Sequence, residues 1–296
     1  MKIIKPDFYD DFKCIANNCK ASCCSAGWSI DVDAKSLSKY VSSKDDFLKD
    51  VNNYVQIKDG KRVFKQSDNN CVFFENGLCK LVLKYGDKYL CDVCRDYPRF
   101  YNFLGDITEI GLSLDCEEVC RIVLNHKDEI KFLPENCRSR DVQVQKQLDM
   151  KNKIIQMLQQ KSADIGLRIV EVLKFLGSDF IFDKTIFDLF DNFEWLNYDY
   201  KLIKNYLFNQ EYNLNFSMKD FQVENILVCF VYRYFSNKKY KSSDVAKFNF
   251  CLFCTFCCDK LSQFSKEQSS MISSFCRQIE SSYKNVQILL DYFDNK

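Results

Sequence analysis

Cysteine is the residue whose number and spacing could do chemistry in this chain. The 296-residue sequence has 17 cysteines, and nine of them lie between Cys14 and Cys116. Closely spaced thiolates can converge on one metal ion or cluster at little loop-closure cost. We therefore predict a metal-binding set: Cys14, Cys19, Cys23, Cys24, Cys71, Cys79, Cys91, Cys94 and Cys116.

Ligation by sulfur alone suits either zinc or an iron–sulfur cluster. Zinc needs four ligands per ion, so these thiols would hold two structural ions, whereas one [4Fe–4S] cluster would use four of them or three. Cys23 and Cys24 are adjacent, so they could face different centres. The spacing alone leaves the choice open.

Three other counts exclude whole classes of function. His126 is the one histidine, so a Cys2His2 finger or a two-histidine iron site cannot form. There are 8 glycines and no glycine-rich nucleotide-binding turn, which argues against dinucleotide and P-loop binding. The formal charge of +1 gives no overall attraction to nucleic acid or anionic lipid.

A second cysteine box, Cys251-x2-Cys254-x2-Cys257-Cys258, lies in an apolar stretch rich in phenylalanine. Helical spacing places Cys251, Cys254 and Cys258 on one face, which would permit metal or redox chemistry. A buried cysteine also behaves as a small hydrophobic residue. We favour core packing for this box.

The expected helices and strands divide the chain into a cysteine-cluster metal-binding domain, residues 1–125, and a helical domain, residues 126–296. The first is irregular, with short elements and turns. We expect minor strands at Arg62–Phe64, Val72–Phe74 and Ile107–Leu114, and short helices at Asp33–Val41 and Asp115–Leu124, with Asp33 and Asp115 as N-caps. The fold is therefore predicted to be mainly α.

Apolar periodicity predicts the helices of the second domain. One segment ends at Gly177 in the C-cap position, and 221–235 is apolar on nearly every face, which is typical of a central buried helix. Apolar residues recur at three- and four-residue steps from Ile272 to Phe293, so we expect one continuous helix there.

The cysteine pattern resembles the flagellin lysine-N-methylase family and its zinc- or iron-chelating cysteine-cluster domain, over about residues 8–125. The matching motifs are Cys14-x4-Cys19-x3-Cys23-Cys24, Gly27-Trp28, Cys71-Val-Phe-Phe with Cys79, Cys91-x2-Cys94-Arg95-Asp-Tyr97-Pro98-Arg99, and Leu112-Ser-Leu-Asp-Cys116. Glu117 stands where the family has proline.

This resemblance implies an enzyme that transfers methyl groups from S-adenosylmethionine to flagellin lysines with a [4Fe–4S] cluster. A lysine amine must lose its proton before it attacks a methyl carbon. Asp92, Asp96, Tyr97 and Glu109 lie near motif cysteines and are candidate bases, but capping or ion pairing explains each of them as well. The catalytic residues and the residues that bind the methyl donor stay unassigned.

Two other functions fit the same cysteines: a non-catalytic zinc-binding interaction module, and a thiol redox protein. The second is disfavoured because the thiols are many and not one isolated reactive pair. The sequence shows no signal peptide and no apolar run of the roughly 17–25 residues that a membrane span needs. We expect a cytoplasmic protein whose partner is flagellin, with no nucleic-acid or membrane partner.

Overall fold

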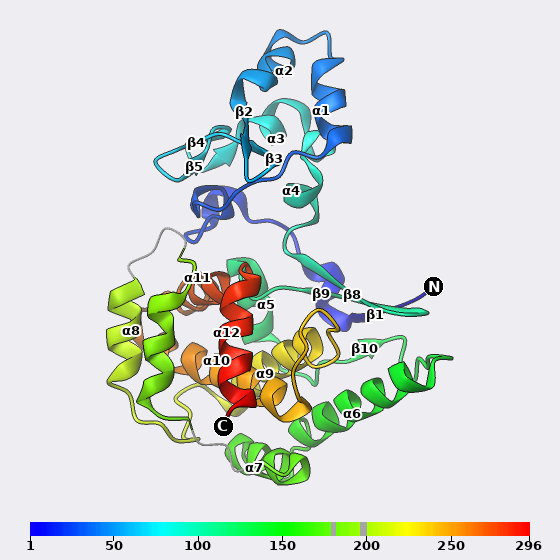
Figure 1. Cartoon of the computed structure of the whole chain (residues 1–296), viewed down its shortest axis with the longest axis vertical. Coiled ribbons are helices and arrows are strands. Elements are labelled where there is room, and N and C mark those ends of the chain that lie inside the picture. Colours follow the sequence, from blue (N-terminus) through cyan, green and yellow to red (C-terminus); the bar gives the residue numbers. More distant parts are fainter. Residues whose placement is uncertain (179–181, 196–199) are drawn as a thin grey trace. The chain divides into compact units, whose positions relative to one another are not determined.

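The computed structural model describes residues 1–178, 182–195 and 200–296. Helices dominate it, and the short strands lie in the N-terminal half (Figure 1). The predicted fold class, mainly α with an irregular N-terminal part of short helices and minor strands, is confirmed.

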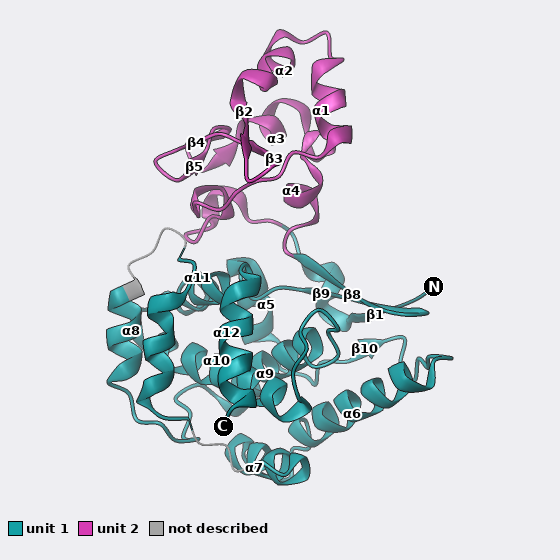
Figure 2. Cartoon of the chain, in the orientation of Figure 1, with its two compact units in different colours: residues 1–13, 99–195, 199–296 teal, residues 14–98, 196–198 magenta. Residues whose placement is uncertain are grey.

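The described chain forms two compact units (Figure 2). Unit 1 comprises residues 1–13, 99–195 and 200–296, and unit 2 comprises residues 14–98. The boundary expected at residue 125 falls inside unit 1, because residues 99–125 pack with the C-terminal helices. For example, the Asn225 side-chain amide donates to the Val123 carbonyl at 3.1 Å.

Unit 2 is built from short elements. Its helices are η2 (Ala16–Asn18), η3 (Cys23–Ser25), α1 (Ala34–Val41), α2 (Asp46–Lys49), η4 (Asp50–Tyr54), α3 (Lys80–Tyr85), η5 (Asp87–Tyr89) and α4 (Asp92–Asp96). Its strands pair as three antiparallel hairpins: β2 (Val55–Lys58) with β3 (Lys61–Phe64), β4 (Gln66–Ser67) with β5 (Asn70–Cys71), and β6 (Phe74–Glu75) with β7 (Leu78–Cys79).

Local predictions in unit 2 hold in part. Asp33 caps α1, since its side chain accepts the Ser36 N–H at 2.8 Å, and β3 covers the predicted strand Arg62–Phe64. The strand expected at Val72–Phe74 is wrong, because residues 72–73 are the link between β5 and β6.

Unit 2 also has an apolar core of its own. Ten buried residues form it: Ile30, Val32, Tyr40, Leu48, Val51, Phe64, Cys71, Phe73, Leu81 and Cys91. The rings of Phe64 and Phe73 meet edge to face at 4.9 Å. Two predicted metal ligands, Cys71 and Cys91, are thus members of this core.

Unit 1 begins with a four-stranded sheet of order β10-β1-β9-β8. Its strands are β1 (Lys2–Pro6), β8 (Arg99–Leu104), β9 (Ile107–Leu112) and β10 (Phe132–Leu133), and β1 runs parallel to β9. One face of the sheet buries Ile4, Leu104 and Ile107 against Val144, Leu148 and Tyr232.

The rest of unit 1 is helical. Its helices are η1 (Asp7–Asp11), α5 (Glu117–Asn125), α6 (Val142–Leu158), α7 (Ile165–Leu176), η6 (Lys184–Asn192), α8 (Tyr200–Phe208), α9 (Asp220–Tyr234), α10 (Asp244–Phe264), α11 (Gln268–Glu280) and α12 (Tyr283–Asp294). Gly177 ends α7 in the left-handed conformation (φ 69°), as predicted. Helix α9 is buried on nearly every face, also as predicted.

Two helix predictions are wrong in unit 1. The segment from Ile272 to Phe293 is two helices, because Ser282 interrupts it and caps α12 by accepting the Asn285 N–H at 3.2 Å. Apolar spacing continues across the break and conceals it. Cys116, and not Asp115, is the N-cap residue of α5, while the Asp115 N–H donates to Glu280 Oε2 at 3.1 Å.

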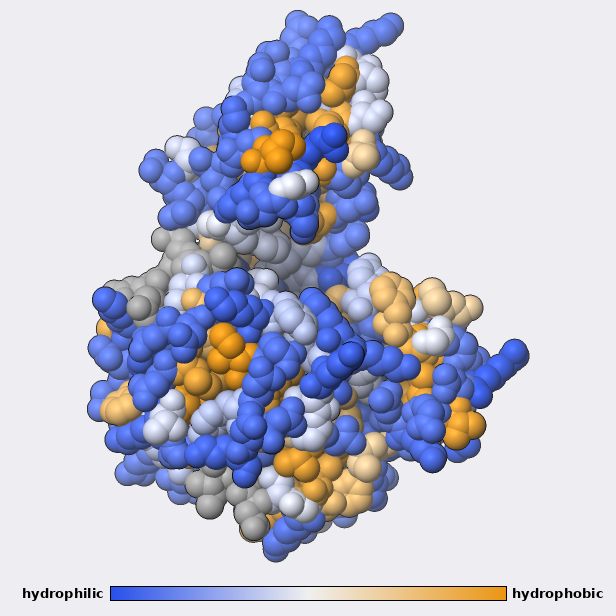
Figure 3. All heavy atoms as spheres, in the orientation of Figure 1, coloured by the Kyte–Doolittle hydropathy of each residue, from blue (hydrophilic) through white to orange (hydrophobic). Residues whose placement is uncertain are grey.

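The surface carries no large continuous apolar region on the face that Figure 3 shows, where apolar residues form several separate patches among hydrophilic ones. Exposed apolar side chains include Ile57 and Phe103. None of the helices in the described ranges has the length and apolar character needed to cross a membrane.

Candidate metal centre

Unit 2 places eight of the nine predicted ligands on short elements and the turns between them. Cys14 and Cys19 flank η2, Cys23 and Cys24 open η3, Cys71 ends β5, Cys79 ends β7, Cys91 is the N-cap residue of α4 and Cys94 lies within α4. Thiols at the ends of elements keep their side chains clear of a regular backbone ladder. Such positions can turn several thiols towards one point.

A tight turn links β6 to β7 and so sets the position of Cys79. Asn76 and Gly77 both have positive φ, 50° and 81°, which is the pattern of a two-residue hairpin turn. A Cβ on Gly77 would lie 3.1 Å from the Cβ of Asn17, in η2. Glycine therefore lets this turn approach the segment between Cys14 and Cys19.

Trp28 fixes the loop that follows the Cys23-Cys24 pair. Its indole N–H donates to the Cys23 carbonyl at 2.6 Å, and its ring meets Tyr97 edge to face at 5.2 Å. The Trp28 carbonyl accepts the Gln66 side-chain amide at 2.5 Å. These contacts tie three segments of the unit together around the cysteines.

Cys91 and Cys94 are joined by a hydrogen bond between their thiols. The Cys94 thiol donates a hydrogen bond to the Cys91 sulfur, which lowers the pKa of Cys91 and, together with burial, raises that of Cys94. Asp33 stabilises the start of α4, since its second carboxylate oxygen accepts the Asp92 N–H at 2.9 Å. The sequence predicted Asp33 only as a helix cap and gave no sign of this second contact.

Four more thiols lie within electrostatic reach of that pair. Burial, together with smaller contributions from Cys79, Cys91 and Cys23, raises the pKa of Cys71 to about 11. Cys23 and Cys24 likewise raise the pKa of Cys94. Six of the predicted ligands in unit 2 are therefore linked by their influence on one another's pKa: Cys23, Cys24, Cys71, Cys79, Cys91 and Cys94.

The other three predicted ligands are Cys14, Cys19 and Cys116. Cys14 is exposed and Cys19 half-buried in unit 2, whereas Cys116 belongs to unit 1, where its carbonyl accepts the Cys120 N–H at 3.0 Å. Within the described residues, no three histidine, cysteine or acidic side chains are arranged closely enough to hold a metal ion as they stand. The ligand set stays a prediction.

The donor chemistry of the six gathered thiols fits a thiophilic metal. A metal ligand must be a thiolate, and Cys91 already has a lowered pKa. Burial raises the pKa of Cys71 and Cys79, so these would ionise only beside a positive ion. Both zinc and an iron–sulfur cluster meet that condition.

Each candidate base has a structural partner. Asp92 and Asp96 both pair with Arg95, at 2.5 and 3.4 Å, and Tyr97 packs on Trp28. Glu109 is buried in unit 1 and forms an ion pair with Lys151. The geometry assigns none of them as a base for methyl transfer.

The second cysteine box lies in the middle of α10. Cys251, Cys254, Cys257 and Cys258 are all fully buried there, and burial raises the pKa of each. Cys258 and Cys276 of α11 contact each other with 3.7 Å between their sulfurs. These thiols occupy the helical core, in agreement with the packing interpretation.

Comparison with known proteins adds to this geometry. Over 134 residues the chain is 28% identical to lysine-N-methylases of Salmonella typhimurium and Salmonella choleraesuis. The chain is similar to lysine-N-methylases. The resemblance to this methyltransferase family is thereby confirmed. Over the same length the chain is 29% identical to the flagellar biosynthetic protein FliU of Salmonella muenchen.

The similarity covers 43% of this chain, 79% of FliU and 33% of each lysine-N-methylase. The match to the lysine-N-methylases therefore spans only a third of their length. No family model and no solved structure matches the chain at a significant level.

Proposed function

We propose that this chain acts in the N-methylation of protein lysines, with S-adenosylmethionine as the methyl donor and flagellin as the protein substrate. In the reaction the lysine nitrogen forms a bond to the methyl carbon, and the bond from that carbon to the donor sulfur breaks. The similarity to lysine-N-methylases and to a flagellar biosynthetic protein supports this proposal.

The observation that carries the proposal is a set of six cysteines in unit 2 that affect one another's pKa: Cys23, Cys24, Cys71, Cys79, Cys91 and Cys94. We propose that these thiols hold a [4Fe–4S] cluster. When bound, such a cluster would supply an iron with an open position for the amino and carboxylate groups of the methyl donor. No glycine-rich nucleotide turn is present in the sequence to hold the donor instead.

The chain's own residues prepare this site. Cys91 ionises more readily than an ordinary thiol, because the Cys94 thiol donates to its sulfur and lowers its pKa. The Asp33 carboxylate holds the Asp92 N–H, and Trp28 holds the Cys23 carbonyl. These hydrogen bonds fix the backbone beside three of the thiols before any metal arrives, which lowers the ordering cost of binding.

The direct test is anaerobic incubation of the purified protein with S-adenosylmethionine and flagellin, followed by mass spectrometry of flagellin peptides. We expect methyl increments on lysine, and loss of these increments in the Cys91→Ser variant. The matched control is Cys254→Ala, which removes a thiol of the buried α10 box and should keep the activity.

Metal analysis of the same samples separates the alternatives. Brown protein with iron and acid-labile sulfide in comparable amounts supports the cluster. Colourless protein with stoichiometric zinc and no methyl increment would overturn the proposal and favour a zinc-binding interaction module.

A further inference from the structure

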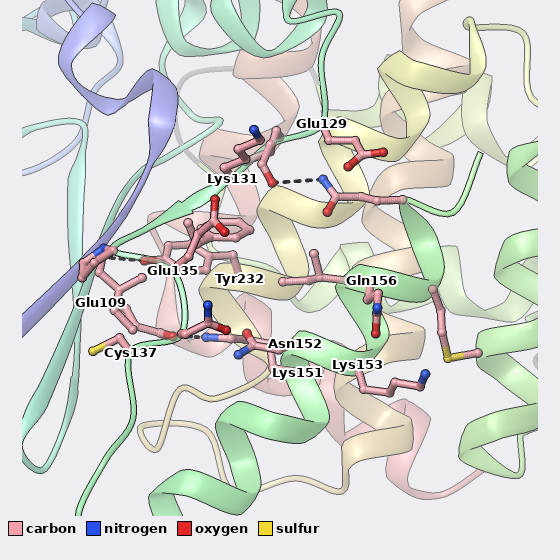
Figure 4. Close-up of a pocket in the computed structure, with 18 of the residues that line it drawn as sticks. Glu109, Glu129, Lys131, Glu135, Cys137, Lys151, Asn152, Lys153, Gln156 and Tyr232 are labelled. Atoms are coloured by element: carbon pink, nitrogen blue, oxygen red, sulfur yellow. Dashed lines mark hydrogen bonds and ion pairs between the residues drawn. The ribbon is translucent and has the colours of Figure 1, made fainter.

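Unit 1 contains a polar pocket of about 760 Å³ that the metal proposal does not use. It lies between the segment 129–137, which includes β10, and helix α6 (Figure 4). Glu109 of β9, Lys151 of α6 and Tyr232 of α9 line it as well, and Figure 4 shows the three side chains close together.

Lys151 is held in one position beside this pocket. Its side chain is only 2% exposed, and its ammonium nitrogen forms an ion pair with Glu109 Oε1. The same nitrogen lies 4.9 Å from the centre of the Tyr232 ring. That ring is fixed in turn, because the Tyr232 hydroxyl donates to the Ile4 carbonyl at 2.8 Å and the ring stacks on Phe132 at 4.1 Å.

The ion pair has unused hydrogen-bonding capacity on both sides. Glu109 Oε2 is buried and has no hydrogen-bond partner among the described residues. Lys151 can make three hydrogen bonds, and the bond to Glu109 uses one. A buried ion pair with open positions is costly for a purely structural contact, and such pairs are frequent at functional sites.

The environment also favours the reactive form of this lysine. The Glu109 carboxylate favours the charged ammonium, while burial favours the neutral amine. Burial prevails and lowers the pKa of Lys151 to about 7. A large share of Lys151 is then unprotonated at neutral pH, against roughly one part in a thousand for an ordinary lysine. The neutral amine is the form that attacks carbonyl carbon.

We propose that Lys151 forms a Schiff base with a small polar aldehyde or ketone that enters this pocket. The Lys151 nitrogen bonds to the carbonyl carbon to give a carbinolamine, which then loses water to leave a carbon–nitrogen double bond. Both protons of the amine depart with the carbonyl oxygen in that water. Glu109 accepts each proton from the nitrogen and delivers it to the oxygen, so no oxidant or reductant is consumed.

The lining of the pocket suits a polar ligand. Asn152, Lys153 and Gln156 of α6 contribute polar side chains to its wall, and Lys131 and Glu129 contribute charges of both signs from the opposite segment. Phe132 and Tyr232 give one stacked aromatic surface. A short hydroxy aldehyde matches this mixture better than an apolar carbonyl compound does.

The experiment traps the Schiff base in the wild-type chain at pH 7. Glycolaldehyde is added with sodium cyanoborohydride, which reduces the imine to a stable amine, and peptide mass spectrometry then gives the modified fraction of each lysine. Lys153 is the matched control, because it lines the same pocket but is exposed. We expect modification of Lys151 to be at least about tenfold faster than that of Lys153.

Two further samples make the result decisive. Glu109→Gln should slow modification of Lys151 and leave that of Lys153 unchanged, since only Lys151 uses the Glu109 carboxylate. Urea unfolding of the wild-type chain should abolish the preference for Lys151. Equal or slower modification of Lys151 in the folded chain would overturn the proposal and leave Lys151–Glu109 as a structural ion pair.

Discussion

The same cysteine spacing occurs in both units and has opposite consequences. In unit 2, Cys91-x2-Cys94 spans the start of the short helix α4, and a thiol–thiol hydrogen bond lowers the pKa of Cys91. In unit 1, Cys254-x2-Cys257 lies in the middle of the 21-residue helix α10, and burial raises the pKa of both thiols.

The difference arises from the position of each pair in its helix. A thiol at a helix N-terminus lies beside unpaired backbone N–H groups and the positive end of the helix dipole, both of which favour a thiolate. A thiol inside a buried helix is removed from water, which disfavours the charged thiolate and raises its pKa. The Cys254-x2-Cys257 pair is therefore part of the hydrophobic core, whereas the hydrogen bond from Cys94 keeps Cys91 available as a thiolate and leaves Cys91-x2-Cys94 as a candidate ligand pair.

Removal of one thiol from each pair is expected to give the largest contrast. Cys91→Ser should lose most of the bound metal, because serine is a poor ligand for a thiophilic metal. Cys254→Ala should keep the wild-type metal content. Elemental analysis of the two purified variants measures this directly, and similar metal loss in both would show that the two pairs do not differ as described.

Alkylation of the metal-free protein should distinguish the pairs by rate, since the thiolate is the reactive form of cysteine. Both Cys91 and Cys254 are buried, but iodoacetamide should modify Cys91 faster near neutral pH, because the pKa of Cys91 is lowered and that of Cys254 is raised. Mass spectrometry over a time course gives both rates. Comparable rates would contradict the assignment of Cys254 to the core.

A smaller effect is expected on stability. Cys254→Ala should lower the free energy of unfolding by about 1 kcal/mol, because a fully buried side chain loses its packing. Cys14→Ala should change the same free energy by less than about 0.5 kcal/mol, because Cys14 is exposed. Urea unfolding of the two metal-free variants measures both changes. A larger loss of unfolding free energy in Cys14→Ala than in Cys254→Ala would contradict this prediction.

The last effect concerns pH and a buried amine of unit 1. Burial lowers the pKa of Lys151 to about 7 in the folded chain, whereas the unfolded chain keeps a value near 10.4. Between these values the unfolded chain binds more protons, so stability should rise with pH, by at most about 1.4 kcal/mol per pH unit. Denaturation midpoints at pH 7 and pH 9 measure the slope.

Lys151→Met is the control for this slope, because it removes the titrating amine and keeps a side chain of similar length. The variant should show a flatter dependence of stability on pH over the same window. An unchanged slope would mean that another group titrates there.

Short-range signals allowed accurate prediction of several parts of this molecule. Asp33 precedes a helix and caps it, and Gly177 ends a helix in the left-handed conformation. These outcomes depend on hydrogen bonds within a few residues, so local sequence is sufficient. The break at Ser282 does not show in the apolar pattern, because apolar residues keep helical spacing on both sides of it; the preference of serine for N-caps is the one local signal of the break.

The sequence by itself determined the mainly α fold, the thiol-only donor set and the resemblance to lysine-N-methylases. Only the tertiary structure decided that Cys23, Cys24, Cys71, Cys79, Cys91 and Cys94 lie in unit 2, where they affect one another's pKa, and that Cys116 belongs to unit 1. It likewise paired Glu109 with Lys151, 42 residues away. Composition and local spacing are properties of the chain, whereas burial and the neighbours of a thiol or an amine depend on contacts between distant segments.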